Sequence, residues 1–100
     1  MSLSDISVHE AYERSATVQL LDVREEFEVA ESMIPGSLHI PMGQLNERLG
    51  ELDAAVDVIT VCRSGNRSGK VADALSTAGF RAHNMAGGIV AWQQAGLPTS

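Results

Sequence analysis

Cys62 is the residue best suited to covalent chemistry, because it is the only cysteine and it opens a polar segment that contains two glycines. That segment reads CRSGNRSGK and ends at Lys70. A thiol attacks as its thiolate, so the surroundings of Cys62 decide whether it can react. Three features of the segment are expected to lower the pKa of the thiol.

The first two features come from the backbone. Gly65, Asn66 and Gly69 tolerate unusual backbone angles, so the loop can turn successive N–H groups inward as a nest for an anion. A strand is predicted before the loop and a helix after it. The positive N-terminal end of that helix would point at the loop. These donors could also stabilise an anionic persulfide on Cys62.

The third feature is formal charge. Arg63, Arg67 and Lys70 are three of the seven basic residues, although the chain has a net charge of −6. An acidic chain is a poor partner for nucleic acid or an anionic membrane, so we expect neither. A local cationic site in such a chain predicts a small anionic ligand. The alternative is that these bases are solvated side chains on a helix face.

Structural roles compete with chemical ones elsewhere as well. A free cysteine is more often a buried structural residue. Such a cysteine would more often lie within an apolar run, whereas Cys62 stands at the junction of a strand and a polar loop. Asp22 and Arg24 could form an acid–base pair. We expect instead a buried salt bridge or a bond to loop backbone, in which Asp22 helps hold the Cys62 loop. Trp92 is expected in the core or the wall of the site.

Composition narrows the class of protein. A single cysteine excludes an intramolecular disulfide and a cysteine-based zinc site. His9, His39 and His83 are scattered, so we predict no metal and no other cofactor. The chain lacks a signal-like N-terminus and any apolar run near the length of a membrane span, which favours the cytoplasm. One domain over residues 1–100 is the simplest organisation.

Strands and helices are predicted to alternate along the chain. Residues 7–10 fit a capping box, Pro35-Gly36 a turn, and Gly87-Gly88 a loop. Strands are predicted at 18–23, 37–40, 56–61 and 80–85, and helices at 8–14, 25–31, 42–52, 68–78 and 89–95. This alternation predicts an α/β domain with a mainly parallel sheet. Ligands bind at the carboxyl ends of such strands, where Cys62 follows the strand 56–61.

Four segments in this order resemble the rhodanese family over nearly the whole chain. They are LLDVRE at 20–25, IPGSLHIP at 34–41, CRSGNRS at 62–68 and GGIVAW at 87–92, with GLP at 96–98 closing the last. One departure is visible, because the family usually carries Gly-His before the Ile-Pro-Gly turn and this chain has Ser32 and Met33. The usual His is not the nucleophile, so the departure bears on local packing and the mouth of the site.

The resemblance implies a rhodanese-like three-layer sandwich, in which helices flank a five-stranded, mainly parallel sheet. It also implies a thiosulfate sulfurtransferase that carries sulfur as a Cys62 persulfide. The donor would be a small anion such as thiosulfate, and the acceptor a thiol, cyanide or a protein. The residues expected to bind the donor or the persulfide are Arg63, Ser64, Gly65, Asn66, Arg67 and Ser68.

Three other functions stay open. A phosphatase or arsenate reductase of the Cys-x5-Arg kind would need a longer loop, because Arg67 follows Cys62 after four intervening residues and the sixth position is Ser68. A Cys–His hydrolase would need His39 or His83 to reach Cys62. The domain could also be a sulfur relay or an interaction module with little turnover of its own.

Overall fold

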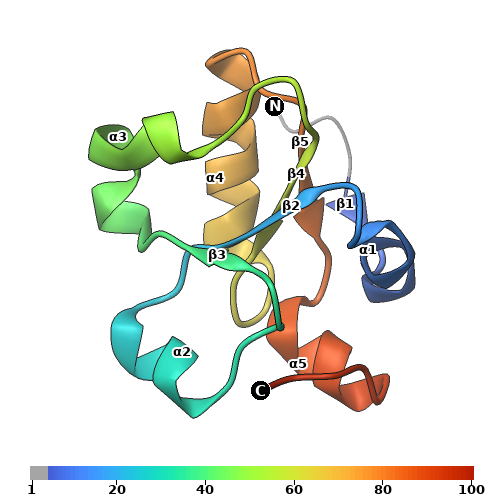
Figure 1. Cartoon of the computed structure of the whole chain (residues 1–100). Coiled ribbons are helices and arrows are strands. Elements are labelled where there is room, and N and C mark those ends of the chain that lie inside the picture. The colour runs from blue at the N-terminus through green and yellow to red at the C-terminus, as the bar shows by residue number, and fades with distance from the viewer. Residues whose placement is uncertain (1–4) are drawn as a thin grey trace.

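The strand that leads into Cys62 lies at the centre of a parallel sheet. The computed structural model describes residues 5–100, and these form a five-stranded sheet in the order β1-β5-β4-β2-β3 (Figure 1). The strands are β1 (Asp5–Ile6), β2 (Gln19–Asp22), β3 (Leu38–His39), β4 (Val58–Val61) and β5 (Ala82–Met85). All four residues of β4 are buried, as expected of a central parallel strand covered on both faces.

Helices cover the two faces of this sheet, and each face has its own apolar core. On one face, α1 (Val8–Arg14) and α5 (Gly88–Gln94) pack over Ile59 and Val61. On the other face, α4 (Asn66–Thr77) packs over Val58. Cys62 belongs to the core of this second face, so its side chain lies on the α4 side. The α/β three-layer sandwich and the five-stranded parallel sheet are confirmed.

Three local predictions were wrong. No strand was predicted at 5–6, because two residues carry no recognisable period; parallel pairing with β5 forms it. The segment 42–52 is not one helix but η1 (Met42–Gln44), α3 (Leu45–Arg48) and η2 (Leu49–Glu51). Its leucines still reach the core while the backbone tightens into 3₁₀ turns at each end. Gly88, predicted in a loop, is the first residue of α5.

The remaining elements agree more closely with expectation. Ser7 caps α1, and its hydroxyl accepts the N–H of Glu10 at 3.1 Å. α2 (Glu26–Glu31) contains no buried residue and begins with Glu25 as its N-cap. α4 begins two residues before the predicted Ser68. No helix within residues 5–100 is long and apolar enough to cross a membrane. The expectation of no N-terminal signal concerns in part residues 1–4, which lie outside the described residues.

Candidate active site

The Cys62 sulfur is buried at the base of a loop that donates hydrogen bonds to it. The residue is 1% exposed, and its Sγ accepts the N–H of Gly65 at 3.1 Å and the hydroxyl of Ser68 at 3.2 Å. Gly65 has a φ of +103°, a conformation that suits glycine, and it immediately precedes α4. The inward-pointing N–H donors expected of this loop are therefore present.

These hydrogen bonds control the ionisation of the thiol. Burial raises the pKa of Cys62, but hydrogen bonds from the Ser68 hydroxyl and from the backbone N–H groups of Ser68, Gly65 and Ser64 outweigh it. The net result is a pKa lowered below the usual value of a cysteine. The three bases expected to lower it are not among the main causes, so hydrogen bonding contributes more than formal charge to favouring the thiolate.

The N-terminus of α5 supports the loop from behind. The N–H of Ile89 donates to the carbonyl oxygen of Cys62 at 2.9 Å, and that of Val90 to the carbonyl oxygen of Arg63 at 3.1 Å. These are N–H groups that a helix leaves without partners in its first turn. With the two carbonyls held by α5, the following N–H groups are free to face the sulfur. Gly88 permits the contact, since a Cβ there would overlap both carbonyl oxygens.

Asn84 of β5 is a residue of the site that sequence reasoning missed. Its Oδ1 lies 2.6 Å from the Ser68 hydroxyl oxygen and shares the single Ser68 proton with Cys62 Sγ, while its Nδ2 donates to the carbonyl oxygen of Gly65 at 3.1 Å. Asn84 is only 4% exposed. A buried amide requires hydrogen-bond partners. An asparagine inside a predicted strand was therefore the signal in the sequence that could have identified this residue. Through these two contacts Asn84 links the Cys62 loop to β5.

Asp22 and Arg24 form the buried salt bridge that was expected in preference to an acid–base pair. Arg24 donates from Nε to Oδ1 at 2.9 Å and from Nη2 to Oδ2 at 2.8 Å, with both side chains at most 5% exposed. Asp22 lies beside Val61 in the sheet. It therefore holds the end of the strand before Cys62, while its carboxylate binds Arg24 rather than the loop.

Ser32 and Met33, which depart from the family's usual Gly-His, are held by contacts to their backbone and to the Ser32 hydroxyl. Arg24 Nη2 donates to the carbonyl oxygen of Ser32 at 2.7 Å. Gln93 of α5 donates to the Ser32 hydroxyl at 3.2 Å. Met33 exchanges two backbone hydrogen bonds with Ser100, at 2.9 and 3.2 Å. The position of the family's usual Gly-His thus ties the end of α2 to α5 and to the last residues of the chain.

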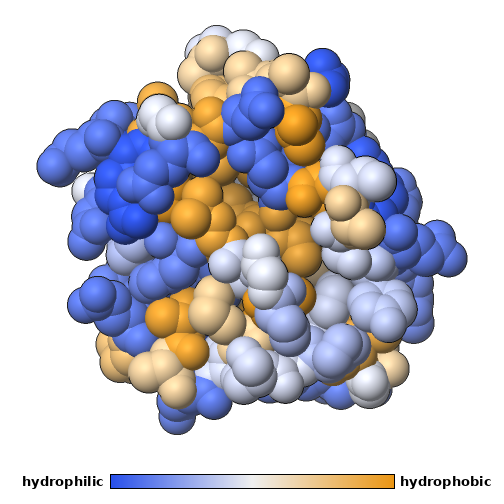
Figure 2. Space-filling view, in the orientation of Figure 1, coloured by the Kyte–Doolittle hydropathy of each residue, from blue (hydrophilic) through white to orange (hydrophobic). Residues whose placement is uncertain are grey.

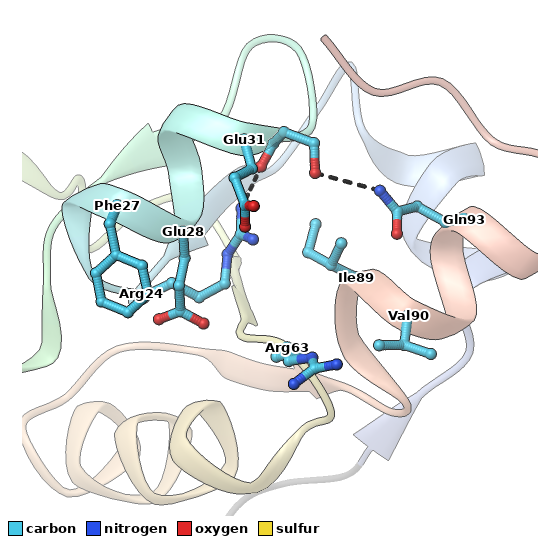
Figure 3. A pocket seen from close by; sticks show the side chains of 9 residues that line it. Arg24, Phe27, Glu28, Glu31, Arg63, Ile89, Val90 and Gln93 are labelled. Carbon is cyan, nitrogen blue, oxygen red and sulfur yellow. Dashed lines mark hydrogen bonds between the residues drawn. The ribbon is translucent and has the colours of Figure 1, made fainter.

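A cavity of about 360 Å³ borders the loop. Figure 3 shows α2 on one side of it and α5 on the other, with Arg63 between them. Its lining residues are Arg24, Phe27, Glu28, Glu31, Ser32, Arg63, Ile89, Val90 and Gln93. The ring of Phe27 is unusually open for an aromatic residue, since 72% of this residue is exposed. The cavity thus combines an apolar rim with charges of both signs.

The three loop bases have different surroundings. Arg63 is exposed and lines this cavity. Arg67 points its guanidinium at Glu28 of α2, with nitrogen–oxygen distances of 2.7 and 2.8 Å. Lys70 lines a separate shallow groove between α3 and α4. In Figure 2 hydrophobic surface gathers in the middle of the face where these two helices lie. The sequence placed all three together, but the structure separates them.

The histidines and the tryptophan have structural contacts. His39 Nε2 lies 2.6 Å from the carbonyl oxygen of Arg24, and His83 Nε2 lies 3.6 Å from a carboxylate oxygen of Asp57. Neither histidine reaches Cys62 in these contacts, which gives the hydrolase interpretation no support. Trp92 is buried and donates to the carbonyl oxygen of Pro98 at 2.8 Å. Within residues 5–100, no three His, Cys, Asp or Glu side chains are grouped as metal ligands would be.

Comparison with known proteins places this fold and loop in one family. The model of the rhodanese-like domain matches residues 7–95, so the chain belongs to the rhodanese-like domain family. A putative sulfurtransferase of Bacillus subtilis, YtwF, is 41% identical over 91% of this chain and 88% of its own length. A sulfurtransferase of Allochromatium vinosum is 42% identical over 81% of this chain and 77% of its own.

Solved structures agree with the family assignment. The crystal structure of a rhodanese-related protein from Thermoplasma volcanium superposes with a TM-score of 0.93. It is 32% identical and the match covers 97% of each chain. The likeness therefore extends over both layers of helices as well as the sheet.

Proposed function

We propose that this protein is a sulfurtransferase that carries sulfane sulfur as a persulfide on Cys62. The observation that carries the proposal is the Cys62 sulfur itself, which accepts hydrogen bonds from Gly65 and Ser68 and has a lowered pKa. A thiolate held in this way is a ready nucleophile. Family membership and relatives named sulfurtransferases support sulfur transfer as the reaction class.

Thiosulfate transfer would occur by two displacements. The Cys62 thiolate attacks the outer sulfur of thiosulfate, a new S–S bond forms, and the S–S bond of thiosulfate breaks. Sulfite leaves with the electron pair of that bond. A thiophilic acceptor, either cyanide or a thiolate, then attacks the outer sulfur of the persulfide and releases the Cys62 thiolate. Electrons balance at each step, so no cofactor enters this scheme.

The loop residues have separable roles in this scheme. The backbone N–H of Gly65 already donates to the sulfur, and with the neighbouring N–H groups of Ser64 and Ser68, which also lower the pKa of the thiol, it would hold the outer sulfur of the anionic persulfide. Arg63, exposed at the cavity, would attract the donor. Asn66 is the first residue of α4, so its backbone belongs to the positive end of that helix. Arg67 directs two of its N–H donors at Glu28, so a donor anion would compete with that carboxylate for its charge.

Intact-mass measurement tests the proposal directly. The protein is incubated with thiosulfate, its mass is measured, and cyanide is then added. We expect a gain of one sulfur atom that cyanide removes as thiocyanate. Cys62→Ala should gain none, and its thermal unfolding should show that it is folded. Absence of the sulfur adduct in wild type, with both thiosulfate and a persulfide donor, would reject sulfur transfer.

A protein acceptor is the second candidate, in which the domain acts as a sulfur relay. The exposed ring of Phe27 beside the cavity supports it, because exposed aromatic residues suit protein contacts. A relative, the putative sulfur carrier protein YrkF of Bacillus subtilis, is 34% identical, and the match covers 45% of that protein. A relay would form the adduct in full but release thiocyanate slowly. Hydrolysis of an aryl phosphate would instead favour the phosphatase alternative.

A further inference from the structure

Arg67 is held by a carboxylate from another element. Its Nη1 lies 2.7 Å from Glu28 Oε1 and its Nη2 lies 2.8 Å from Oε2, which is a two-point ion pair. Such pairs are among the stronger charge-assisted contacts in proteins. Glu28 is itself fixed, because Oε1 also accepts the N–H of Glu25 at 3.0 Å at the start of α2. The guanidinium therefore presents two of its donors to a well-anchored partner.

The charges around the cavity are balanced rather than cationic. Arg24 is neutralised by Asp22, and Arg67 by Glu28. Among the remaining lining residues, exposed Arg63 is opposed by exposed Glu31. A donor with two negative charges would meet little excess positive charge here, and it would have to compete with Glu28 for Arg67. A donor with one negative charge depends less on excess positive charge, so the balanced charges would weaken its binding less.

We propose that Glu28 is a specificity-determining residue, which withholds Arg67 from dianionic sulfur donors and so favours donors of lower charge. This inference rests on the proposed function, because it concerns the donor step of sulfur transfer. It predicts that thiosulfate binds weakly to the wild-type protein for an electrostatic reason. Neutralising Glu28 should release Arg67 and improve the binding of thiosulfate in particular.

Two donors that differ by one charge make the test sharp. Thiosulfate is a dianion, whereas methanethiosulfonate, in which a methyl group replaces one oxygen, is a monoanion. In both, the Cys62 thiolate attacks the terminal sulfur. The leaving group carries away the electron pair of the broken S–S bond, as sulfite from thiosulfate and as methanesulfinate from methanethiosulfonate. The chemistry at sulfur is therefore matched while the charge of the donor changes.

The main variant is Glu28→Gln, which keeps the shape and an acceptor oxygen but loses the charge. We expect its KM for thiosulfate to fall about fivefold, since releasing an ion pair of this kind is worth about 1 kcal/mol. The KM for methanethiosulfonate should change by less than about twofold, and kcat should change little with either donor. Equal changes of KM for the two donors, or none, would overturn the inference.

Two further variants separate Arg67 from a general charge effect. Glu26→Gln removes the same charge from the same helix but neither lines the cavity nor pairs with Arg67, so it should leave the ratio of the two KM values nearly unchanged. Glu28→Gln combined with Arg67→Gln removes the pair without changing net charge, and its KM for thiosulfate should return to about the wild-type value. A thiosulfate KM that stays low in this double variant would show that Arg67 is not responsible.

The outcomes distinguish the inference from the function on which it rests. If wild type transfers sulfur from both donors but Glu28→Gln does not shift their KM ratio, the inference fails and sulfur transfer stands. If neither of these donors nor a persulfide donor loads Cys62, the proposed function fails, and the inference fails with it. Thermal unfolding establishes that each variant is folded. Glu28→Ala replaces the glutamine variant if that variant does not fold.

Discussion

The hydroxyl oxygen of Ser68 lies 3.2 Å from the sulfur of Cys62, and both residues are almost fully buried. Ser68 stands in the first turn of α4, so the helix delivers a side-chain donor to the thiol in addition to backbone N–H groups. Among the contributions that lower the pKa of Cys62, this hydroxyl is the largest.

Ser68→Ala should therefore raise the pKa of Cys62. A hydrogen bond to a charged group is worth about 1.5–3 kcal/mol, so alkylation of the thiol by iodoacetamide at neutral pH should slow by about tenfold or more. The rate measured from pH 5 to 10 gives the pKa. Ser64→Ala is the matched control, because Ser64 acts through its backbone N–H, which the variant keeps. A pKa unchanged in Ser68→Ala would contradict the assigned contact.

Asn84→Asp should also raise the pKa of Cys62. A hydroxyl has a single proton to donate, and a carboxylate at position 84 would draw the Ser68 proton away from the sulfur while adding a negative charge nearby. The same alkylation profile measures the change. Asn46→Asp makes the same charge change in the groove between α3 and α4, away from the loop, and should leave the profile as in wild type. Equal profiles for the two variants would refute this role of Asn84.

Gly88→Ala should destabilise the protein and loosen the Cys62 loop. Gly88 has a φ of +61°, and a Cβ would overlap the carbonyl oxygens of Cys62 and Arg63. Backbone strain and overpacking together suggest a loss of about 2–4 kcal/mol in the free energy of unfolding. Gly43→Ala is the control, since nothing lies within 4 Å of its added Cβ. Urea denaturation measures the loss in the free energy of unfolding for both variants. Similar losses would contradict the role assigned to Gly88.

Stability at acid pH should report the Glu28–Arg67 pair. Hydrogen bonding from Arg67 lowers the pKa of Glu28 from 4.5 to about 2. A carboxyl whose pKa is lower in the folded state adds stability above its unfolded pKa and loses it as the pH falls through the folded value. The contribution should therefore disappear between about pH 4.5 and 2. Because the pair is partly exposed, we expect about 1–2 kcal/mol rather than the full shift.

Glu28→Gln is the variant that isolates this contribution. Its free energy of unfolding should vary less with pH in that window than that of wild type, by about the same 1–2 kcal/mol. Urea denaturation at several pH values measures the difference. Parallel pH profiles for the two proteins would mean that the pair does not stabilise the folded state. The low pKa also implies that neutral assay conditions never release Arg67 by protonating Glu28.

Much of the fold could be predicted because its signals are local. The apolar β-branched run before Cys62 and the helical spacing after it place the residue at a strand–helix junction, and the structure agrees. The segment 42–52 shows the limit of such patterns. Its leucine spacing identifies the buried face correctly, but the spacing does not say that the backbone would break into three short helical pieces. The two residues of β1 are too few to show any period.

The chemistry of the Cys62 thiol was likewise readable from neighbours along the chain. Gly65, a helix start and Ser68 lie within six residues of it, so the donors that favour its thiolate are local. The cations were not readable in this way, because the partner of a charged side chain depends on which elements pack together. Glu28 reaches Arg67 across 39 positions, and Lys70, on the same helix as Arg67, lines a different groove.

Local pattern was thus enough for the order of elements, the parallel sheet and a cysteine at its carboxyl edge with a lowered pKa. Long-range packing set the rest. Asn84 joins the loop to β5, Gly88 brings α5 against the carbonyls of Cys62 and Arg63, and Glu28 neutralises Arg67. The physical reason is that hydrogen bonds and ion pairs act over a few ångströms. Residues far apart in the chain meet at that range only once the layers have assembled.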